Sequence, residues 1–170
     1  MTTTALPYDP AMVRYVQHDL LVRVGLTISP EFERALWPTA WRPREKVVTG
    51  GVQAGKSTEG AAEVYIEIPI IDLDRPEPWR YWYIVPTYET PKIELGYIFD
   101  WTRSFYGSDS ISDHMPDGSS ALLSIFGGRI IIETRSSKLP ESIAAQAVDG
   151  IVGVESGQQA EAVRTAALER

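Results

Sequence analysis

A glycine-rich segment near residue 50 constrains this chain more than any other feature, because it fits the pattern G-x-x-x-x-G-K-[ST]. The segment reads Gly50, Gly51, Val52, Gln53, Ala54, Gly55, Lys56, Ser57 and Thr58. A β-branched run at 46–49 precedes it and a helix-compatible run at 57–65 follows it, which is the strand–loop–helix context that the pattern requires. The sequence therefore predicts a phosphate-binding loop rather than a glycine-rich turn that matches by accident.

The residue types in this loop suit a triphosphate. Glycines let the backbone approach a phosphate with its N–H groups pointing inward, and the following helix presents its positive N-terminal end. Lys56 adds a cation for the β- and γ-phosphates, and the Ser57 hydroxyl can ligate Mg²⁺. We therefore expect the chain to bind a nucleoside triphosphate with Mg²⁺.

Composition excludes several other classes of protein. The 170 residues, 44% of them hydrophobic, are enough for one core, so we expect one domain over 11–170 after a loosely ordered 1–10. The chain has no cysteine and only His18 and His114, which leaves little material for a metal site of these residues or a Ser-His-Asp triad. A net charge of -7 argues against DNA binding by bulk electrostatics. No apolar run approaches the roughly 20 residues of a membrane span and no signal peptide is evident, so we expect a soluble, intracellular protein without membrane contact.

Upstream of the loop, local signals predict two helices. The first covers 11–24 and ends at Gly25, with one apolar face formed by Met12, Val13, Val16, Leu20, Leu21 and Val24. Ser29 as N-cap and Pro30 at the first position predict a second helix that ends before Pro38. Four residues lie just upstream of the loop: Trp37, Trp41, Arg42 and Arg44. Either one of them borders the nucleotide base, or they serve in core packing and surface charge. For each residue taken singly, the second role is favoured.

Downstream of the loop, the pattern alternates between helices and strands. Gly127-Gly128 between two apolar runs predicts a β-hairpin of 121–126 and 129–134, because glycine tolerates the positive φ that a two-residue turn demands. Ile93, Tyr97, Ile98, Trp101 and Phe105 give a helix over 91–105 its apolar spacing. The other expected elements are a helix over 57–68, a connector over 70–79, a buried strand over 81–85, a loop over 108–120, a loop over 136–142, a strand over 151–155 and a helix over 161–170.

Hydrolysis requires a carboxylate beside the phosphates, and Glu155, at the end of the apolar run 151–154, is the candidate for Mg²⁺ binding or water activation. The alternative is a strand-terminal glutamate that faces solvent. Two registers are possible: either Val154 replaces the usual Asp before Glu155, or Glu155 replaces that Asp and Ser156 the following Glu. Ser57 would hold the metal in both. Arg129 and Arg135 are candidates for stabilising the transferred phosphate, although a solvent-facing role is favoured for each singly.

In this order, these segments resemble the ATPase domain of the large terminase subunit of tailed bacteriophages. The resemblance covers roughly residues 12–165, and the phosphate loop alone is generic to many NTPases. More specific are the double glycine at 50–51, the Arg-Ser and Pro-Glu-Ser pieces within 135–142, and the Asp-Gly-strand-Glu ending at 149–155. Segment 82–88 also contributes.

The resemblance implies an α/β P-loop NTPase fold, with a mostly parallel central sheet flanked by helices and an inserted β-hairpin. It implies a motor that hydrolyses ATP with Mg²⁺ and translocates double-stranded DNA into a procapsid. Such a motor works as a homo-oligomeric ring on the portal protein, recruits DNA through a small terminase subunit, and acts in the host cytoplasm and transiently at the portal vertex. Carried over, 50–57 would be the phosphate loop and Glu155 the acidic motif, whereas Val52 and Gln53 stand where many members have an arginine.

After Glu155 there is room for only one helix, so we expect a truncated ATPase domain, incomplete at its C-terminus and without the family's nuclease domain. An incomplete sheet would expose an edge and favour self-association. Two alternatives stay open: a helicase-like or other P-loop NTPase, and a nucleotide-binding module without hydrolysis. A small-molecule kinase fits less well, because no cluster of lid arginines is present.

Overall fold

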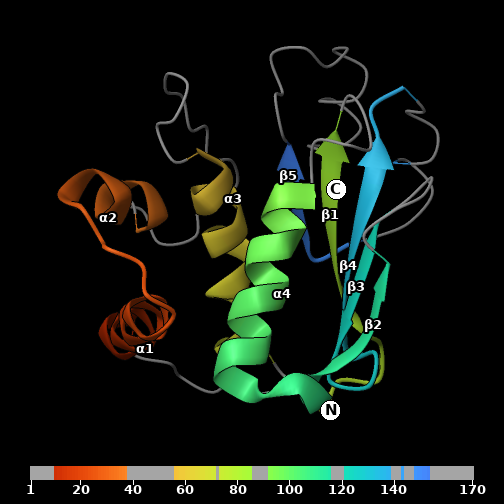
Figure 1. Ribbon diagram of the computed structural model, residues 1–170, viewed down its shortest axis with the longest axis horizontal. Helices are drawn as coiled ribbons and strands as arrows, with labels where there is room; N and C mark the ends of the chain where they lie inside the picture. The colour runs from red at the N-terminus through yellow and green to blue at the C-terminus, as the bar shows by residue number, and fades with distance from the viewer. Residues whose placement is uncertain are drawn as a thin grey trace.

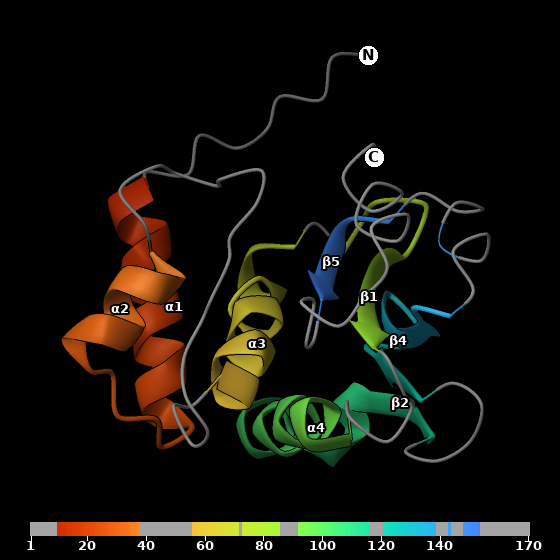
Figure 2. The same ribbon diagram turned by 90° about the horizontal axis from the view of Figure 1, so that it is seen from above.

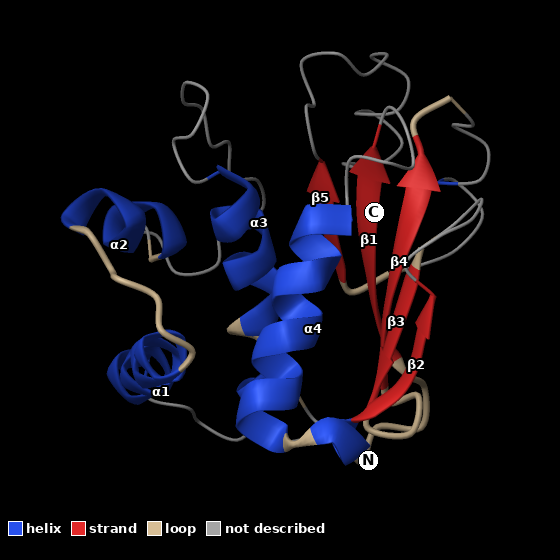
Figure 3. Ribbon diagram, in the orientation of Figure 1, coloured by secondary structure: helices blue, strands red, loops and turns tan. Residues whose placement is uncertain are grey.

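The structure is a computed structural model that describes residues 10–37, 56–71, 73–85, 92–115, 121–138, 143 and 148–153. Within these residues the chain forms a five-stranded sheet with its α-helices on one side (Figure 1; Figure 3). Helices α3 and α4 lie next to the sheet, and α1 and α2 lie on the far side of α3 (Figure 2).

Parallel strands form the centre of the sheet. β1 (Trp79–Val85) lies between β4 (Ile130–Ser136) and β5 (Gly150–Gly153) and is parallel to both. β3 (Leu122–Ile125) and β2 (Ile111–Met115) extend the sheet beyond β4 in antiparallel pairs, which gives the order β2-β3-β4-β1-β5. The predicted α/β fold with an inserted hairpin is confirmed, and the described part of the sheet contains two parallel and two antiparallel pairings.

β1 is buried on both faces. Tyr81, Tyr83 and Val85 point toward the helices and Trp82 and Ile84 toward the opposite face, and none of the five is more than 7% exposed. A short aromatic and β-branched run suits a strand that is covered on both sides. The predicted strand over 81–85 is confirmed, and the structure begins it two residues earlier.

Helices α3 (Lys56–Tyr65) and α4 (Lys92–Tyr106) cover one face of the sheet. Their buried side chains join a single core with the strands, including Ala61, Ala62, Tyr65, Leu95, Ile98 and Trp101. The predicted apolar face of α4 is wrong at three positions, because Ile93, Tyr97 and Phe105 are 58%, 37% and 41% exposed. Helical spacing defines a stripe, but the packing of α4 against α3 and β2 decides which side of that stripe is buried.

Helix α1 (Pro10–Arg23) ends where the sequence predicts. Gly25 has φ 85°, and the N–H groups of Gly25 and Leu26 donate to the carbonyls of Val22 and Leu21 at 3.0 Å. This is a Schellman motif, in which a glycine in the left-handed region satisfies the last carbonyls of a helix. The predicted stop at Gly25 is thus confirmed.

The buried side of α1 differs from the predicted one. Met12 and Val16 are 59% and 39% exposed, whereas Gln17 is buried. The Gln17 amide donates to the Ile66 carbonyl at 3.1 Å and accepts from the Trp37 indole at 2.8 Å. α1 therefore turns a hydrogen-bonded glutamine toward α3 and α2 (Pro30–Leu36), the short helix that begins at Pro30 as predicted.

The hairpin is confirmed, but the segment before it is not the loop that its polarity predicts. Gly127 and Gly128 have φ 67° and 86° as predicted, but the turn has four residues between Ile125 and Ile130 where two were predicted. Segment 108–120 contains a short helix, η2 (Ser108–Ser110), and strand β2. β2 is polar because it lies at the sheet edge, and pairing with β3 overrides its weak strand propensity. The expected strand at 46–49 and the helix at 161–170 lie outside the described residues. So do residues 1–9 of the segment 1–10 that the sequence predicts to be loosely ordered, whereas Pro10 is the first residue of α1.

Candidate nucleotide-binding site

The predicted phosphate loop leads into the N-terminus of α3. Lys56 is the first residue of this helix, and Ser57 and Thr58 are half-buried in its first turn. An N-terminal turn carries unpaired N–H groups and partial positive charge, which favour an anion there. Residues Gly50, Gly51, Val52, Gln53, Ala54 and Gly55, and the side chain of Lys56, lie outside the described part of the chain.

The start of α3 lies at the same edge of the sheet as the carboxyl ends of β5, β1 and β4 (Figure 1). Ligands of open parallel sheets bind outside this edge. The described part of β5 ends at Gly153, two residues before Glu155, which itself lies outside the described residues. The strand that leads to the predicted carboxylate therefore runs toward the edge at which the predicted loop enters α3.

Helix α3 is bonded directly to the central strand. The Tyr83 phenol donates to the Gly60 carbonyl at 2.7 Å, and a Cβ on Gly60 would lie 3.7 Å from Cγ1 of Val152 on β5. Burial raises the pKa of Tyr83 well above its ordinary value, and the nearby carboxylate of Glu94 raises it further, so the phenol remains a donor at neutral pH. These contacts fix α3 over β1 and β5.

Arg135 lies at the carboxyl end of β4, but its side chain is on the sheet face away from α3. Its Nη2 donates to Oε2 of Glu133 at 2.7 Å, and its guanidinium carbon lies 5.0 Å from the Trp82 ring centre. Glu133 also accepts from Nη1 of Arg80 at 3.5 Å. Arg135 thus lies at the carboxyl edge of the sheet, but its side chain makes an ion pair and a cation–π contact on the face away from α3.

Arg129 lies at the other edge of the sheet. It precedes β4, and its carbonyl accepts from the Trp79 N–H at 2.9 Å, at the amino end of β1. Arg129 and Arg135 are six positions apart along this strand, roughly 20 Å at about 3.3 Å per residue. Within one chain, the structure therefore does not bring Arg129 to the start of α3.

Of the four residues predicted either to border the nucleotide base or to serve in packing and surface charge, the structure describes Trp37 alone. Trp37 is half-buried, donates to Gln17 and has the Arg14 guanidinium 5.6 Å from its ring centre. These contacts belong to the packing of α1 against α2, which favours the packing role for Trp37. Trp41, Arg42 and Arg44 lie outside the described residues.

Two buried carboxylates near this edge were not predicted from the sequence. Glu59 is 6% and Glu94 2% exposed, in the first turns of α3 and α4. An acidic residue in a first helical turn usually reflects the helix dipole, so nothing in the sequence marked these two as buried. Among the described residues, no group of three or more His, Asp or Glu could hold a metal ion. The hydroxyl of Ser57 is an oxygen ligand of the kind that Mg²⁺ prefers, so the described part of this edge fits the ion.

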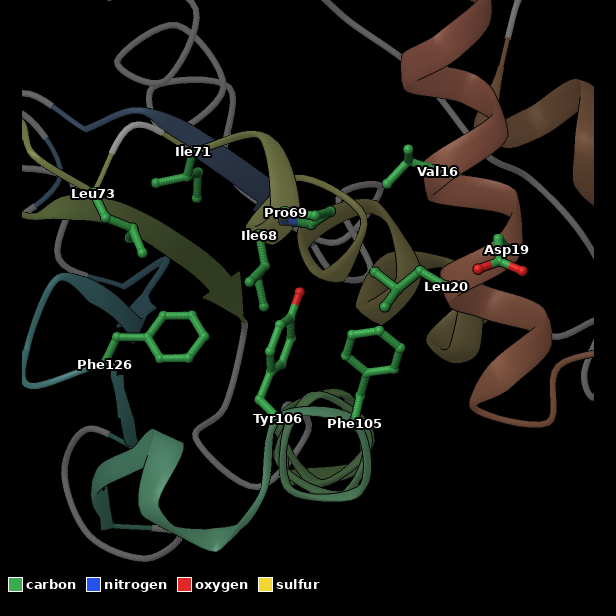
Figure 4. Close-up of a pocket in the computed structure, with 10 residues that line it drawn as sticks. All are labelled: Val16, Asp19, Leu20, Ile68, Pro69, Ile71, Leu73, Phe105, Tyr106 and Phe126. Atoms are coloured by element: carbon green, nitrogen blue, oxygen red, sulfur yellow. The ribbon is translucent and has the colours of Figure 1, made fainter.

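A cavity of about 390 Å³ lies elsewhere, beside the ends of α3 and α4 that are remote from this edge (Figure 4). Its described lining is apolar apart from the hydroxyl of Tyr106 and the carboxylate of Asp19, which pairs with Arg23 at 2.6 Å. Phe126, in the turn before β4, and Tyr106, at the end of α4, place the cavity near the amino ends of the strands. The described residues of its lining include no basic side chain for a phosphate, and the cavity is separate from the candidate site.

Comparison with solved structures identifies a relative in fold. The chain is similar to the large terminase ATPase domain of Thermus phage P74-26, determined as an arginine-to-alanine mutant, with a TM-score of 0.52 and 18% sequence identity. The chain has the fold of a large terminase ATPase domain. The match covers 70% of this chain and 51% of the terminase structure, so the chain spans about half the length of the structure that it matches.

No family model matches the sequence, and no curated protein matches it. The terminase ATPase fold therefore rests on the arrangement of the elements, with α3 over a parallel β1–β5 pair. None of the described helices has the length and apolar character needed to cross a bilayer.

Proposed function

We propose that this chain is the ATP-binding and ATP-hydrolysing motor domain of a viral DNA-packaging terminase. The observation that carries the proposal is the start of α3: the Lys56-Ser57 pair of the loop motif opens a helix at the carboxyl edge of a parallel sheet. A triphosphate at this edge would meet unpaired backbone N–H groups and the helix dipole. The similarity in fold to a terminase ATPase domain supports the same assignment.

The roles follow from the chemistry of the residues. Backbone amides of 50–58 would cradle the phosphates, and Lys56 would neutralise charge on the β- and γ-phosphates. Ser57 and Glu155 would hold Mg²⁺, which when bound offsets the phosphate charge. Glu155 would also orient the attacking water.

The two candidate arginines differ in which nucleotide site they could reach. Arg135 would have to leave Glu133 and Trp82 to reach a phosphate of its own chain. Arg129, at the opposite edge, could serve only the site of a neighbouring copy in a ring, since catalytic arginines can be supplied in trans. Arg135 is therefore the candidate for action in cis, and Arg129 only for action in trans.

The partners of the motor are part of the same proposal. Double-stranded DNA, the portal protein, the small terminase subunit and a homo-oligomeric ring follow from the terminase assignment. With a net charge of -7, the chain would need a local basic surface or another domain to hold DNA. We therefore expect DNA to stimulate turnover only in the assembled motor.

Two variants test the proposal. Because Lys56 makes charge-assisted contacts to the phosphates, Lys56→Ala should weaken binding of Mg·ATP roughly 10- to 100-fold in calorimetry. Glu155→Gln should retain binding and lower turnover by roughly 10²- to 10⁴-fold in a phosphate-release assay. Exposed Lys138→Ala and Glu77→Gln are matched controls that should behave as wild type.

The outcomes separate the alternatives. Binding without turnover, even with portal and DNA, would favour a nucleotide-binding module. Turnover stimulated by DNA alone, and unaffected by the portal, would favour a helicase-like or other P-loop NTPase. Wild-type binding by Lys56→Ala would contradict a phosphate loop altogether.

A further inference from the structure

A buried hydrogen bond connects α3 to the sheet close to the candidate site. The side chain of Tyr83 is 0% exposed, and its hydroxyl lies 2.7 Å from the Gly60 carbonyl oxygen. A carbonyl oxygen has two lone pairs, so this one can accept from the phenol in addition to its helical bond. Gly60 lies four residues after Lys56, about one helical turn, so the bond acts close to the first turn of α3.

The same point of α3 also touches the neighbouring strand. A Cβ at Gly60 would lie 3.7 Å from Cγ1 of Val152, so the α3 backbone passes close over β5. Within the sheet, Val152 pairs with Tyr83. Gly60, Tyr83 and Val152 therefore form a joint of three elements, which we call the Gly60 joint. The joint lies about one helical turn after Lys56, and in sequence Glu155 follows three residues after Val152.

We propose that Tyr83 is a positioning residue for ATP hydrolysis, which holds the phosphate-loop helix at a set distance from the carboxyl end of β5. This inference rests on the function proposed above. In the proposed function, phosphate binding depends on groups of the loop and of the first turn of α3. Hydrolysis depends in addition on the distance between the start of α3 and the carboxylate that follows β5, and small displacements of reacting groups have large effects on rate. Loss of the Gly60 joint should therefore affect turnover much more than binding.

Tyr65 provides a matched control on the same helix. It is also 0% exposed, and its phenol donates to the Trp101 carbonyl at 3.2 Å. That bond connects α3 to α4, not to the sheet. Tyr65→Phe and Tyr83→Phe each remove one buried phenol hydroxyl and keep the ring, so they should lower the melting temperature by similar amounts.

The experiment compares these variants in the whole 170-residue chain, with Mg·ATP as the probe. Tyr83→Phe should lower kcat, and with it the rate constant of hydrolysis in single-turnover experiments, roughly tenfold or more. Its Kd for Mg·ATP should change less than about twofold. Tyr65→Phe should keep both constants. Val152→Ala removes side-chain packing between β5 and α3 without removing a hydrogen bond, and it should also lower kcat, as Tyr83→Phe does.

Each outcome decides the inference. Equal kcat for Tyr83→Phe and Tyr65→Phe would show that the Tyr83 bond serves stability alone. A parallel loss of binding and turnover in Tyr83→Phe would equally overturn the inference, because the helix itself would then be disturbed. If the wild-type chain binds Mg·ATP but does not hydrolyse it, Tyr83 has no hydrolysis to support, and the inference is refuted as well. A wild-type chain that does not bind Mg·ATP refutes the proposed function itself.

Discussion

The two faces of β1 and β4 are built differently, although the same two strands supply both. The face under α3 and α4 is closed by apolar and aromatic side chains such as Tyr83 and Ile132, which are fully buried. Among the described residues, the other face has a small apolar centre around Trp82, bordered by partly exposed charged side chains, Arg80, Glu133 and Arg135. The helix-covered face therefore supplies most of the stability of the sheet, and the other face keeps charge close to the candidate site.

The largest expected effect tests this difference within one strand. Ile132 is 0% exposed on the helix-covered face, and the adjacent Ile131 is half-buried on the other. Ile132→Ala should lower the free energy of unfolding by about 2–5 kcal/mol, because it removes buried methyl groups and leaves a cavity. Ile131→Ala should cost about half of that or less, because its side chain is partly in water already. Urea denaturation of both variants measures the difference, and equal losses would contradict the assignment of faces.

The second effect concerns the ion pairs of the charged face. Glu133→Gln keeps the shape of the side chain but removes the charge that Arg80 and Arg135 share. We expect a loss of about 1 kcal/mol that shrinks in high salt, because the pairs are partly exposed and therefore screened. Asp19→Asn, which breaks the exposed helical pair with Arg23, is the control and should cost less, about 0.3–0.5 kcal/mol. A salt-independent loss for Glu133→Gln would show that packing, not charge, holds this side chain.

Local signals predicted much of the fold and the start of the candidate site. Gly25, Pro30 and the double glycine at 127–128 each mark a boundary through their own backbone preferences, and the structure confirms all three. The Lys56-Ser57 pair marks the beginning of a helix for the same reason. These features depend on a few neighbouring residues, which is why one sequence is enough to find them.

Features that depend on distant pairing could not be predicted in this way. β2 is a strand only because β3 lies beside it, and its own residues are mostly polar. Arg129 and Arg135 flank the same predicted strand, but only the parallel alignment of β4 with β1 shows that the Arg135 end lies at the carboxyl edge of the sheet, with the start of α3. The bond from Tyr83 to Gly60 joins residues 23 positions apart and has no sequence pattern of its own.

The smallest expected effect extends the comparison of faces to α4. Ile93 and Leu95 are two residues apart, but Ile93 is 58% exposed and Leu95 2%. Ile93→Ala should change the free energy of unfolding by less than about 0.5 kcal/mol, because little apolar surface is lost and alanine is the better helix former. Leu95→Ala, the reference, should lose about 2–5 kcal/mol. A large loss for Ile93→Ala in urea denaturation would mean that another surface covers this side of α4 in solution, and the helix would then be buried on two faces, as β1 is.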